Sequence, residues 1–287
     1  MEKEEFKTVM IKGVEFNYNT EKGYEKDGHV YCKECGERLD GNVLEHFGGR
    51  KFIFPRQCKC DRLREQKRQE QERINKVGMM KDRCFEFSRS LKKAGFDSVD
   101  GKDEEIVKFA KDYVETFDEM MKENIGIILS GPVGTGKTYL AAAIANGIIE
   151  KYLYSVKFRS IPEIVRDIEK TGFNEGRNEY LDRVCSARLM VFDDFGIERN
   201  TEYAMELLYA IIDTRWKKNL PTIVTTNVPI SELRSENVPI QLKRIYSRLL
   251  DMCGVTLIIK GEDRRKKNNG RKSDKAMEII KKHREDI

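Results

Sequence analysis

The sequence predicts an α/β protein in which a parallel sheet lies between layers of helices and follows a small cysteine-containing module. Three observations lead to this prediction. From about residue 80, short apolar runs alternate with helical segments. The first of these runs leads directly into a glycine-rich turn. The first 60 residues, in contrast, show little helical periodicity and contain four of the seven cysteines.

The composition limits the size of the core and the classes of function that the chain can have. The chain has 287 residues, 36% of them charged and 39% apolar, which is enough for one medium-sized core and a small accessory module. The net charge of +5 permits contact with nucleic acid without indicating it. The first nine residues lack an apolar signal segment, and runs such as 125–129 are too short to span a bilayer. We therefore expect a cytoplasmic protein that does not enter a membrane.

Two cysteine pairs dominate the N-terminal module. Cys32 and Cys35 form a CxxC motif, and Cys58 and Cys60 form a CxC motif. Four thiolates on two such turns predict a tetrahedral zinc site, in which His46 is an alternative ligand to one cysteine. An odd number of cysteines without an export signal favours metal ligation over disulfides. The three other cysteines lie in helix or strand contexts and are expected to be packed in the core: Cys84, Cys185 and Cys253.

A charged run separates this module from the rest of the chain. Residues 61–75 read DRLREQKRQEQERIN, with strong helix formers and almost no apolar face, which predicts an exposed connecting helix. We therefore divide the chain into a zinc-binding module (1–60), a helical linker (61–78), an α/β domain (79–265) and a basic tail (266–287). Within the tail, a short helix is expected over 274–284.

The α/β domain is predicted from its alternating elements. Strands are expected at 125–130, 155–159, 189–193, 222–226 and 255–260. Helices are expected at 103–122, 137–152, 161–171, 179–186, 201–217 and 240–251. Apolar strands separated by helices are typical of βαβ units, whose parallel sheet is covered on both faces.

A phosphate-binding loop follows the first of these strands. The segment GPVGTGKT fits the pattern G-x-x-x-x-G-K-[ST] between a predicted strand and a predicted helix. Backbone N–H groups and the helix N-terminus would hold the phosphates, Lys137 would bridge the β- and γ-phosphates, and Thr138 would ligate Mg²⁺. The predicted ATP-binding residues are Gly131, Pro132, Val133, Gly134, Thr135, Gly136, Lys137 and Thr138.

Polar residues at two later strand ends complete the expected site. In LMVFDDFG, Asp193 is the expected magnesium carboxylate, acting through a bound water, and Asp194 is placed to polarise the attacking water. Asn227, after two threonines, either holds that water near the γ-phosphate or is a turn residue before Pro229. These assignments predict hydrolysis of ATP to ADP and phosphate.

Two arginines extend the prediction to a neighbouring subunit. Arg244 and Arg248 lie four residues apart, and hence on one face of a predicted helix. An arginine that reaches a neighbour's γ-phosphate would make hydrolysis depend on assembly. Without the other motifs, a solvated helix face would explain the pair equally well.

Together these motifs resemble the AAA+ ATPases and, within them, the DnaC/DnaI-type replicative helicase loaders and their IstB relatives. The resemblance covers roughly 125–265 and rests on GPVGTGKT, VFDDFG, TTN, RIYSRL and VTLIIKGEDRR. It implies that Asn227 is the sensor-1 residue and that Arg248 is the arginine finger, with Arg244 as the second candidate. It also implies an AAA+ domain without a full helical lid, as in the loader branch. Asp194 stands where many AAA+ proteins have glutamate, which suggests slow hydrolysis suited to a switch.

The resemblance also implies partners. Loaders of the DnaI type carry an N-terminal zinc module that contacts a hexameric DnaB-type helicase, and the segment with Lys157, Arg159 and Arg166 faces single-stranded DNA in loaders. The implied function is an ATP-dependent helicase loader in replication initiation that self-associates through its AAA+ domain. The alternatives are an IstB-like transposition helper and a zinc-dependent DNA-binding clamp. A P-loop small-molecule kinase would leave TTN and the cysteine module without a role.

Overall fold

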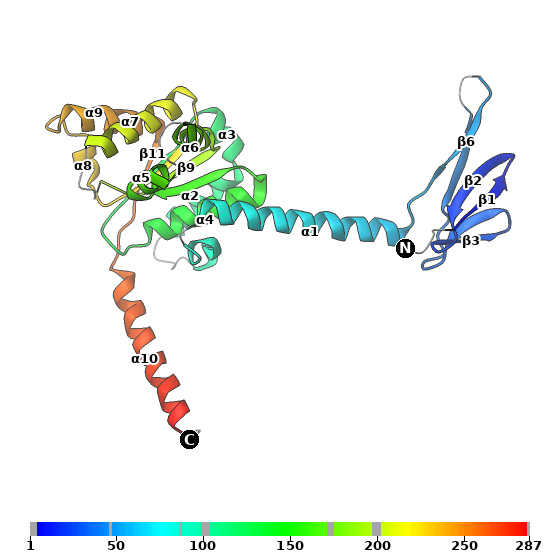
Figure 1. Cartoon of the computed structure of the whole chain (residues 1–287). Coiled ribbons are helices and arrows are strands. Elements are labelled where there is room, and N and C mark those ends of the chain that lie inside the picture. The colour runs from blue at the N-terminus through cyan, green and yellow to red at the C-terminus, as the bar shows by residue number, and fades with distance from the viewer. Residues whose placement is uncertain are drawn as a thin grey trace. The chain divides into compact units, whose positions relative to one another are not determined.

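The computed structural model describes residues 5–45, 48–86, 88–98, 104–170, 175–196 and 202–285. The chain forms two compact units, Met1–Asn75 and Lys76–Ile287 (Figure 1). Among the helices of these residues, none combines the length and the apolar character that spanning a bilayer requires.

The second unit is built on a parallel sheet with the strand order β11-β7-β10-β9-β8. The strands are β7 (Ile127–Ser130), β8 (Val156–Ser160), β9 (Leu189–Phe195), β10 (Thr222–Thr226) and β11 (Val255–Ile258). Every strand predicted for this part of the chain is present. Every residue of β7 and of β10 is buried, because central parallel strands are covered on both faces.

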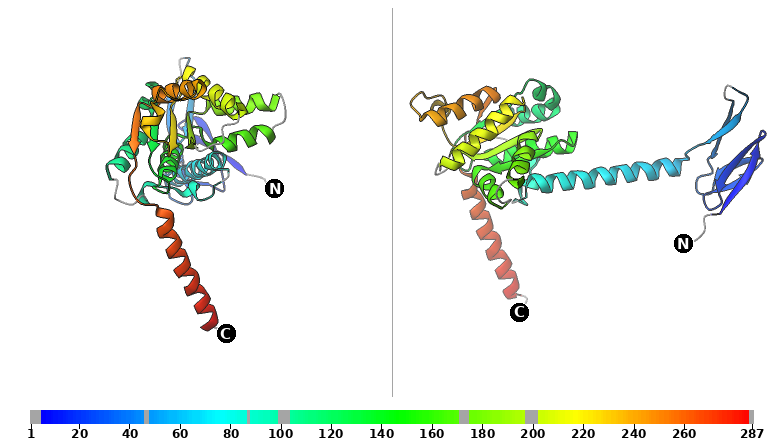
Figure 2. Two further views of the ribbon diagram at one scale, coloured as in Figure 1. Left: turned by 90° about the vertical axis from the view of Figure 1, so that its left-hand side faces the viewer. Right: turned by 45° about the horizontal axis from the view of Figure 1, so that its top comes forward.

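Successive residues of these strands point into two different cores. Ile127 and Leu129 of β7 pack against α2 (Glu104–Glu115), α3 (Phe117–Lys122) and α4 (Lys137–Tyr152). Ile128 packs with the opposite core, which contains α5 (Ile161–Lys170), α6 (Glu175–Ser186), α7 (Glu202–Lys217) and α9 (Ile240–Met252). Helices therefore lie on both sides of the sheet, which confirms the predicted fold class (Figure 2). Short helical turns complete this unit at Leu91–Lys93, Phe96–Ser98 and α8 (Ile230–Leu233).

Several helices differ in extent from the prediction. The single helix expected over 103–122 is divided at Thr116, whose hydroxyl donates to the Asp112 carbonyl oxygen (2.8 Å) and favours a bend. The charged connecting helix, α1 (Lys59–Cys84), runs further than expected because Val77 and Met80 pack against the core of the second unit. After β11, the described residues form a single helix, α10 (Arg264–Glu285), instead of a helical lid. It is longer than the expected 274–284, since no proline interrupts it.

In the described residues of the first unit, the strands form three antiparallel hairpins that precede α1. They pair β1 (Phe6–Ile11) with β2 (Val14–Asn19), β3 (Gly23–Lys26) with β4 (His29–Cys32), and β5 (Asp40–Glu45) with β6 (Lys51–Pro55). Its core contains Val9, Ile11, Phe16, Tyr18 and Val30, with Leu39 and Ile53 at its margin. So small a core usually needs an additional cross-link.

A buried carboxylate fastens two of these hairpins. Burial alone would raise the pKa of Asp40, but hydrogen bonds from Arg38, the Val30 N–H and His29 lower it below its usual value. The Val30 N–H donates to Oδ1 at 2.8 Å and the Arg38 guanidinium to Oδ2 at 2.7 Å. Asp40 therefore provides a polar cross-link at the edge of the small apolar core.

Candidate nucleotide site and cysteine cluster

The glycine-rich loop joins the buried strand β7 to the N-terminus of α4, as predicted. A Cβ atom on Gly131 would lie 2.2 Å from the Ile259 carbonyl oxygen, so no larger residue fits there. Gly136 has a φ of +99° immediately before α4, a conformation that side chains with a Cβ rarely adopt. The loop therefore ends at the N-terminus of α4. Backbone N–H groups of such a loop and of the first helical turn are the groups that bind phosphates.

The side chain of Lys137 crosses this loop. Its Nζ donates to the carbonyl oxygens of Gly131 (2.8 Å) and Pro132 (2.7 Å) and to Oδ1 of Asn227 (2.6 Å). The lysine is 5% exposed. The structure thus brings Asn227, at the end of β10, next to the loop lysine, although the two residues are 90 positions apart.

The two aspartates lie at the carboxyl end of β9, where the pairing with β10 shifts register. Val224 pairs with Phe192, but Thr226 pairs with Phe195, so β9 contains one extra residue at Asp193 and Asp194. Asp194 has a φ of +53°, a strained backbone conformation of the kind that clusters at functional sites.

Thr225 links both aspartates to β10, and sequence reasoning did not assign it a role. Its hydroxyl donates to Oδ1 of Asp193 (2.7 Å) and accepts from the Asp194 N–H (2.9 Å). Burial raises the pKa of Asp193, while hydrogen bonds from the hydroxyls of Thr225 and Thr138 act in the opposite direction. The contact between Thr138 and Asp193 brings the two expected magnesium ligands together. The TTN sequence marked this strand end but not the partner of the threonine hydroxyl.

The two candidate arginines of α9 have different surroundings. Arg248 forms an ion pair with Asp213 (2.7 Å), and its guanidinium lies over the rings of Tyr209 (4.7 Å) and Trp216 (5.6 Å). Arg244 is exposed and lines a cavity of about 460 Å³ between α7 and α9. Arg248 is therefore held by α7 of its own chain, whereas Arg244 faces solvent.

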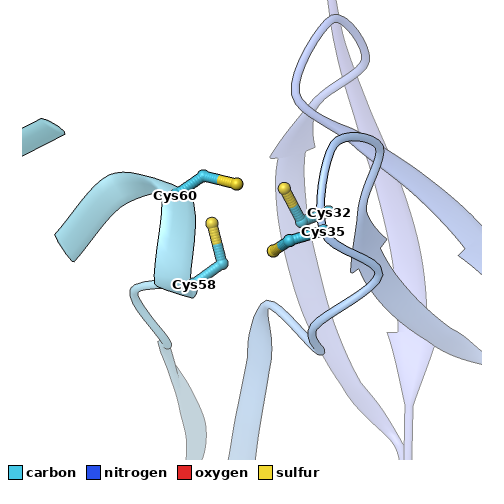
Figure 3. A group of neighbouring side chains, drawn as sticks. All are labelled: Cys32, Cys35, Cys58 and Cys60. Atoms are coloured by element: carbon cyan, nitrogen blue, oxygen red, sulfur yellow. The ribbon is translucent and has the colours of Figure 1, made fainter. Parts of the chain in front are cut away.

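The four cysteines of the first unit converge, although they come from two separate segments (Figure 3). Their sulfur atoms all lie within 4.8 Å of one another. Zn–S bonds of about 2.3 Å place the sulfurs of a tetrahedral site about 3.8 Å apart, so small side-chain adjustments would close the cluster around an ion. Gly36, which follows Cys35 and has a φ of +69°, donates its N–H to the Cys32 carbonyl oxygen (2.9 Å) and so closes the turn that carries the first two cysteines.

The thiols of the cluster differ in their electrostatic surroundings: burial raises the pKa of Cys58 to about 11, and a hydrogen bond with Glu34 raises the pKa of Cys60 to about 12. A hydrogen bond from the Glu37 backbone lowers the pKa of Cys35 to about 7. His46, the alternative ligand, lies outside the described residues. The three cysteines that were expected in the core are buried: Cys84, Cys185 and Cys253.

The segment expected to face DNA is only partly on the surface. Arg159 is 1% exposed, and its guanidinium pairs with Glu86 (2.7 Å) and Asp167 (3.1 Å). A DNA contact by Arg159 would require these pairs to break, so a role for Arg159 in DNA contact is contradicted, whereas contact by Lys157 or Arg166 stays a prediction. Arg166 is exposed on α5 and Lys157 is half-buried on β8.

Comparison with known proteins agrees with this architecture. The family model described as IstB-like ATP binding protein matches residues 61–272. The replicative helicase loader DnaI of Bacillus subtilis is 26% identical over 254 residues, which cover 82% of this chain and 78% of that protein. The replicative helicase loader DnaC of Escherichia coli is 32% identical over 126 residues, which cover 43% of this chain and half of that protein.

Solved structures give the same result for the fold. A crystal structure of DnaI superposes with a TM-score of 0.52 at 28% identity, covering 62% of this chain and 94% of that one. A crystal structure of the DnaC helicase loader gives 0.51 at 24% identity, covering 60% of this chain and all of that one, which is a likeness of fold. With the family model matching well over half of its residues, the chain belongs to the IstB-like ATP-binding proteins and is similar to the DnaI and DnaC helicase loaders.

Proposed function

We propose that the protein is an ATP-dependent loader of a hexameric DnaB-type replicative helicase, and that ATP binding and hydrolysis switch its assembly with helicase and single-stranded DNA during replication initiation. The observation that carries this proposal is the extent of the match to DnaI. The match covers 82% of the chain, whereas the second unit, Lys76–Ile287, makes up less than three quarters of the chain. The match therefore extends into the cysteine-containing unit. A shared ATPase fold alone would not require that extension.

The nucleotide chemistry follows from the loop and the strand ends. ATP phosphates bound at the loop would replace the carbonyl oxygens and Asn227 as acceptors for the Lys137 ammonium. Mg²⁺ would be held by the Thr138 hydroxyl and, through water, by Asp193. An ion held by these residues would neutralise charge that develops on the phosphates. Asp194 would polarise the attacking water, and Asn227, released from Lys137, would orient it.

Hydrolysis would be completed by a neighbouring copy. Arg248 is the proposed finger, and it would exchange Asp213 for the γ-phosphate of the adjacent subunit. The ion pair and the two aromatic rings would hold the arginine inactive in an isolated chain, so that hydrolysis reports assembly. Arg244, exposed one turn earlier, is the second candidate.

The first unit is proposed to bind zinc through Cys32, Cys35, Cys58 and Cys60 and to contact the helicase. The sulfur separations fit a tetrahedral ion, and the apolar core of this unit is small. Metal binding would therefore supply much of its folding free energy. Loss of zinc should then disrupt helicase binding while leaving the ATPase unit folded.

A capture experiment tests the proposal. Purified full-length protein, loaded with zinc or stripped by a chelator, is mixed with the DnaB-type helicase of its host and analysed by size-exclusion chromatography. The proposal requires zinc-dependent co-elution. A zinc-loaded protein that binds and hydrolyses ATP but leaves the helicase unbound would refute the loader function.

One rival function has a specific observation in its favour. The matching family model is that of IstB-like proteins. A transposition helper would use the same nucleotide chemistry with a transposase as its client. The same chromatography with a transposase encoded in the host distinguishes the two, because only the true client should co-elute in an ATP-dependent manner.

A further inference from the structure

A second polar cavity lies at the edge strand of the sheet, apart from the nucleotide loop. Its volume is about 670 Å³, and its walls come from β8, α5, α6 and the C-terminal end of α1. β8 is the last strand of the sheet order, whereas the nucleotide loop follows the inner strand β7. No residue of GPVGTGKT lines the cavity. Pockets of this size accommodate small ligands.

Basic side chains dominate the lining. Five cationic residues face two carboxylates: Arg83, Lys157, Arg159, Lys170 and Arg183 line it together with Glu86 and Asp167. Uniform surface composition would give a more even mixture, since the whole chain carries 54 basic and 49 acidic residues. The excess is local, and it lies in a concavity where low-dielectric walls strengthen an electrostatic field.

The two carboxylates are already committed to the buried arginine. Arg159 Nη2 pairs with Glu86 Oε2 (2.7 Å), and its Nε pairs with Asp167 Oδ2 (3.1 Å). Arg159 Nη1 also donates to the carbonyl oxygens of Cys84 (2.7 Å) and Phe158 (2.8 Å). The Tyr180 hydroxyl donates to Asp167 as well (2.9 Å). This network lines the cavity and keeps one net negative charge, because Arg159 neutralises one of the two carboxylates, so the four other cations of the lining still outnumber it.

Three of these cations, Arg83, Lys157 and Arg183, have little ion pairing within the described residues. Within the described parts of the chain, Lys157 and Arg83 make no ion pair. Arg183 pairs with Glu179 (2.8 Å), but both side chains are more than half exposed, and such a pair contributes little. Burial, together with the nearby Arg159, lowers the pKa of Lys157. A bound anion would relieve this repulsion.

We propose that this cavity is a second phosphate-binding site, at which Lys157, Arg83 and Arg183 bind a ligand carrying two or more negative charges. A single carboxylate would neutralise only one of the cations, whereas adjacent phosphates match several. Arginine forks suit phosphate oxygens geometrically. The same chemistry is offered by a free polyphosphate and by consecutive backbone phosphates of single-stranded nucleic acid. As a polyphosphate site it goes beyond the proposed loading function, and as a site for single-stranded nucleic acid it rests on that function; neither depends on ATP hydrolysis.

The experiment uses the full chain carrying Lys137→Ala, so that the nucleotide loop no longer competes for the probes. Inorganic pyrophosphate is titrated by calorimetry, and an abasic single-stranded oligonucleotide is titrated by fluorescence anisotropy. Lys157→Met and Arg183→Gln are compared with Lys108→Gln, a control at an exposed position of α2 that does not line the cavity. Trp216 fluorescence on heating verifies that each variant remains folded.

Loss of one charge-assisted contact should raise the Kd about tenfold for Lys157→Met and for Arg183→Gln, but not for the control. This pattern with pyrophosphate assigns the site to a small polyphosphate. The same pattern with the oligonucleotide, without saturable pyrophosphate binding, assigns it to backbone phosphates. If both variants bind both probes as the parent does, or if Lys108→Gln loses as much affinity, the cavity is not a phosphate site.

Discussion

Thr225→Val is the most direct test of the geometry at the strand ends. Valine has nearly the shape of threonine and suits the fully buried strand β10, so the substitution removes the hydroxyl without opening a cavity. Two hydrogen bonds disappear, one to the Asp193 carboxylate at 2.7 Å and one from the Asp194 N–H at 2.9 Å. The carboxylate keeps Thr138 as a partner, whereas the N–H is left without an acceptor.

The expected cost follows from these two bonds. A hydrogen bond to a charged group contributes about 1.5–3 kcal/mol, and a buried N–H without a partner costs about 1–3 kcal/mol. The two effects are coupled through one side chain, so we expect a loss of about 3 kcal/mol in the free energy of unfolding. For a unit of this size, that loss lowers the Tm by about 6–12 °C. A misplaced Asp193 should also weaken Mg²⁺-dependent ATP binding.

The chain provides its own probe for this measurement. Its one tryptophan, Trp216, lies in α7 and reports unfolding of the second unit without interference from the first. Thr225→Ser, which keeps the hydroxyl, should lose much less stability. Thr256→Val on β11 is the matched control, because no hydrogen bond of the Thr256 side chain occurs among the described residues. A Thr225→Val protein with the parental Tm and ATP affinity would show that the hydroxyl does not organise the site.

Three further predictions follow from other contacts. Cys32→Ser should reduce zinc, measured by mass spectrometry, from one ion per chain to a small fraction, and should abolish helicase co-elution while leaving ATP binding intact; full zinc retention contradicts the four-cysteine site. Assayed by itself, Arg248→Ala should lose ATPase activity. Mixed with an Asp193→Asn chain it should recover part of that activity, since one chain supplies the intact nucleotide site and the other supplies the arginine. Recovery with Arg244→Ala, and none with Arg248→Ala, would assign the finger to Arg244. Burial raises the pKa of Asp193, so the folded unit binds the carboxyl proton more tightly than the unfolded chain does. Without nucleotide, the free energy of unfolding therefore falls as the pH rises from the pKa of the unfolded chain, about 3.9, to the raised pKa of the folded unit. Asp193→Asn should remove that slope and raise the Tm at neutral pH, and an unchanged pH dependence of Tm would contradict it.

Features that lie within one short segment could be predicted from the sequence. The glycine-rich loop, its lysine and the flanking strand and helix are contiguous, so residue order alone specifies a phosphate-binding turn. The five strands of the sheet were predictable because short apolar runs alternate with helical segments, and the inner strand β7 is buried along its whole length. The cysteine spacing likewise indicated one cluster, since metal ligation restricts which residue types can supply it.

Contacts between distant segments were decided only by the tertiary structure. The strand order places β10 between β7 and β9, which brings Asn227 to Lys137 and Thr225 to Asp193. Helix periodicity placed Arg244 and Arg248 on one face, but packing against α7 separates their environments.

The same distinction explains why Arg159 is buried. Arg159 has a charged side chain that favours solvent, yet its segment becomes the edge strand β8, against which α1 and α5 bring Cys84 and Asp167. The residue types in the sequence therefore determined which functional groups the chain contains. The order of strands and the packing of helices determined which of those groups meet, because the energy of a polar contact depends on a partner supplied from elsewhere in the chain.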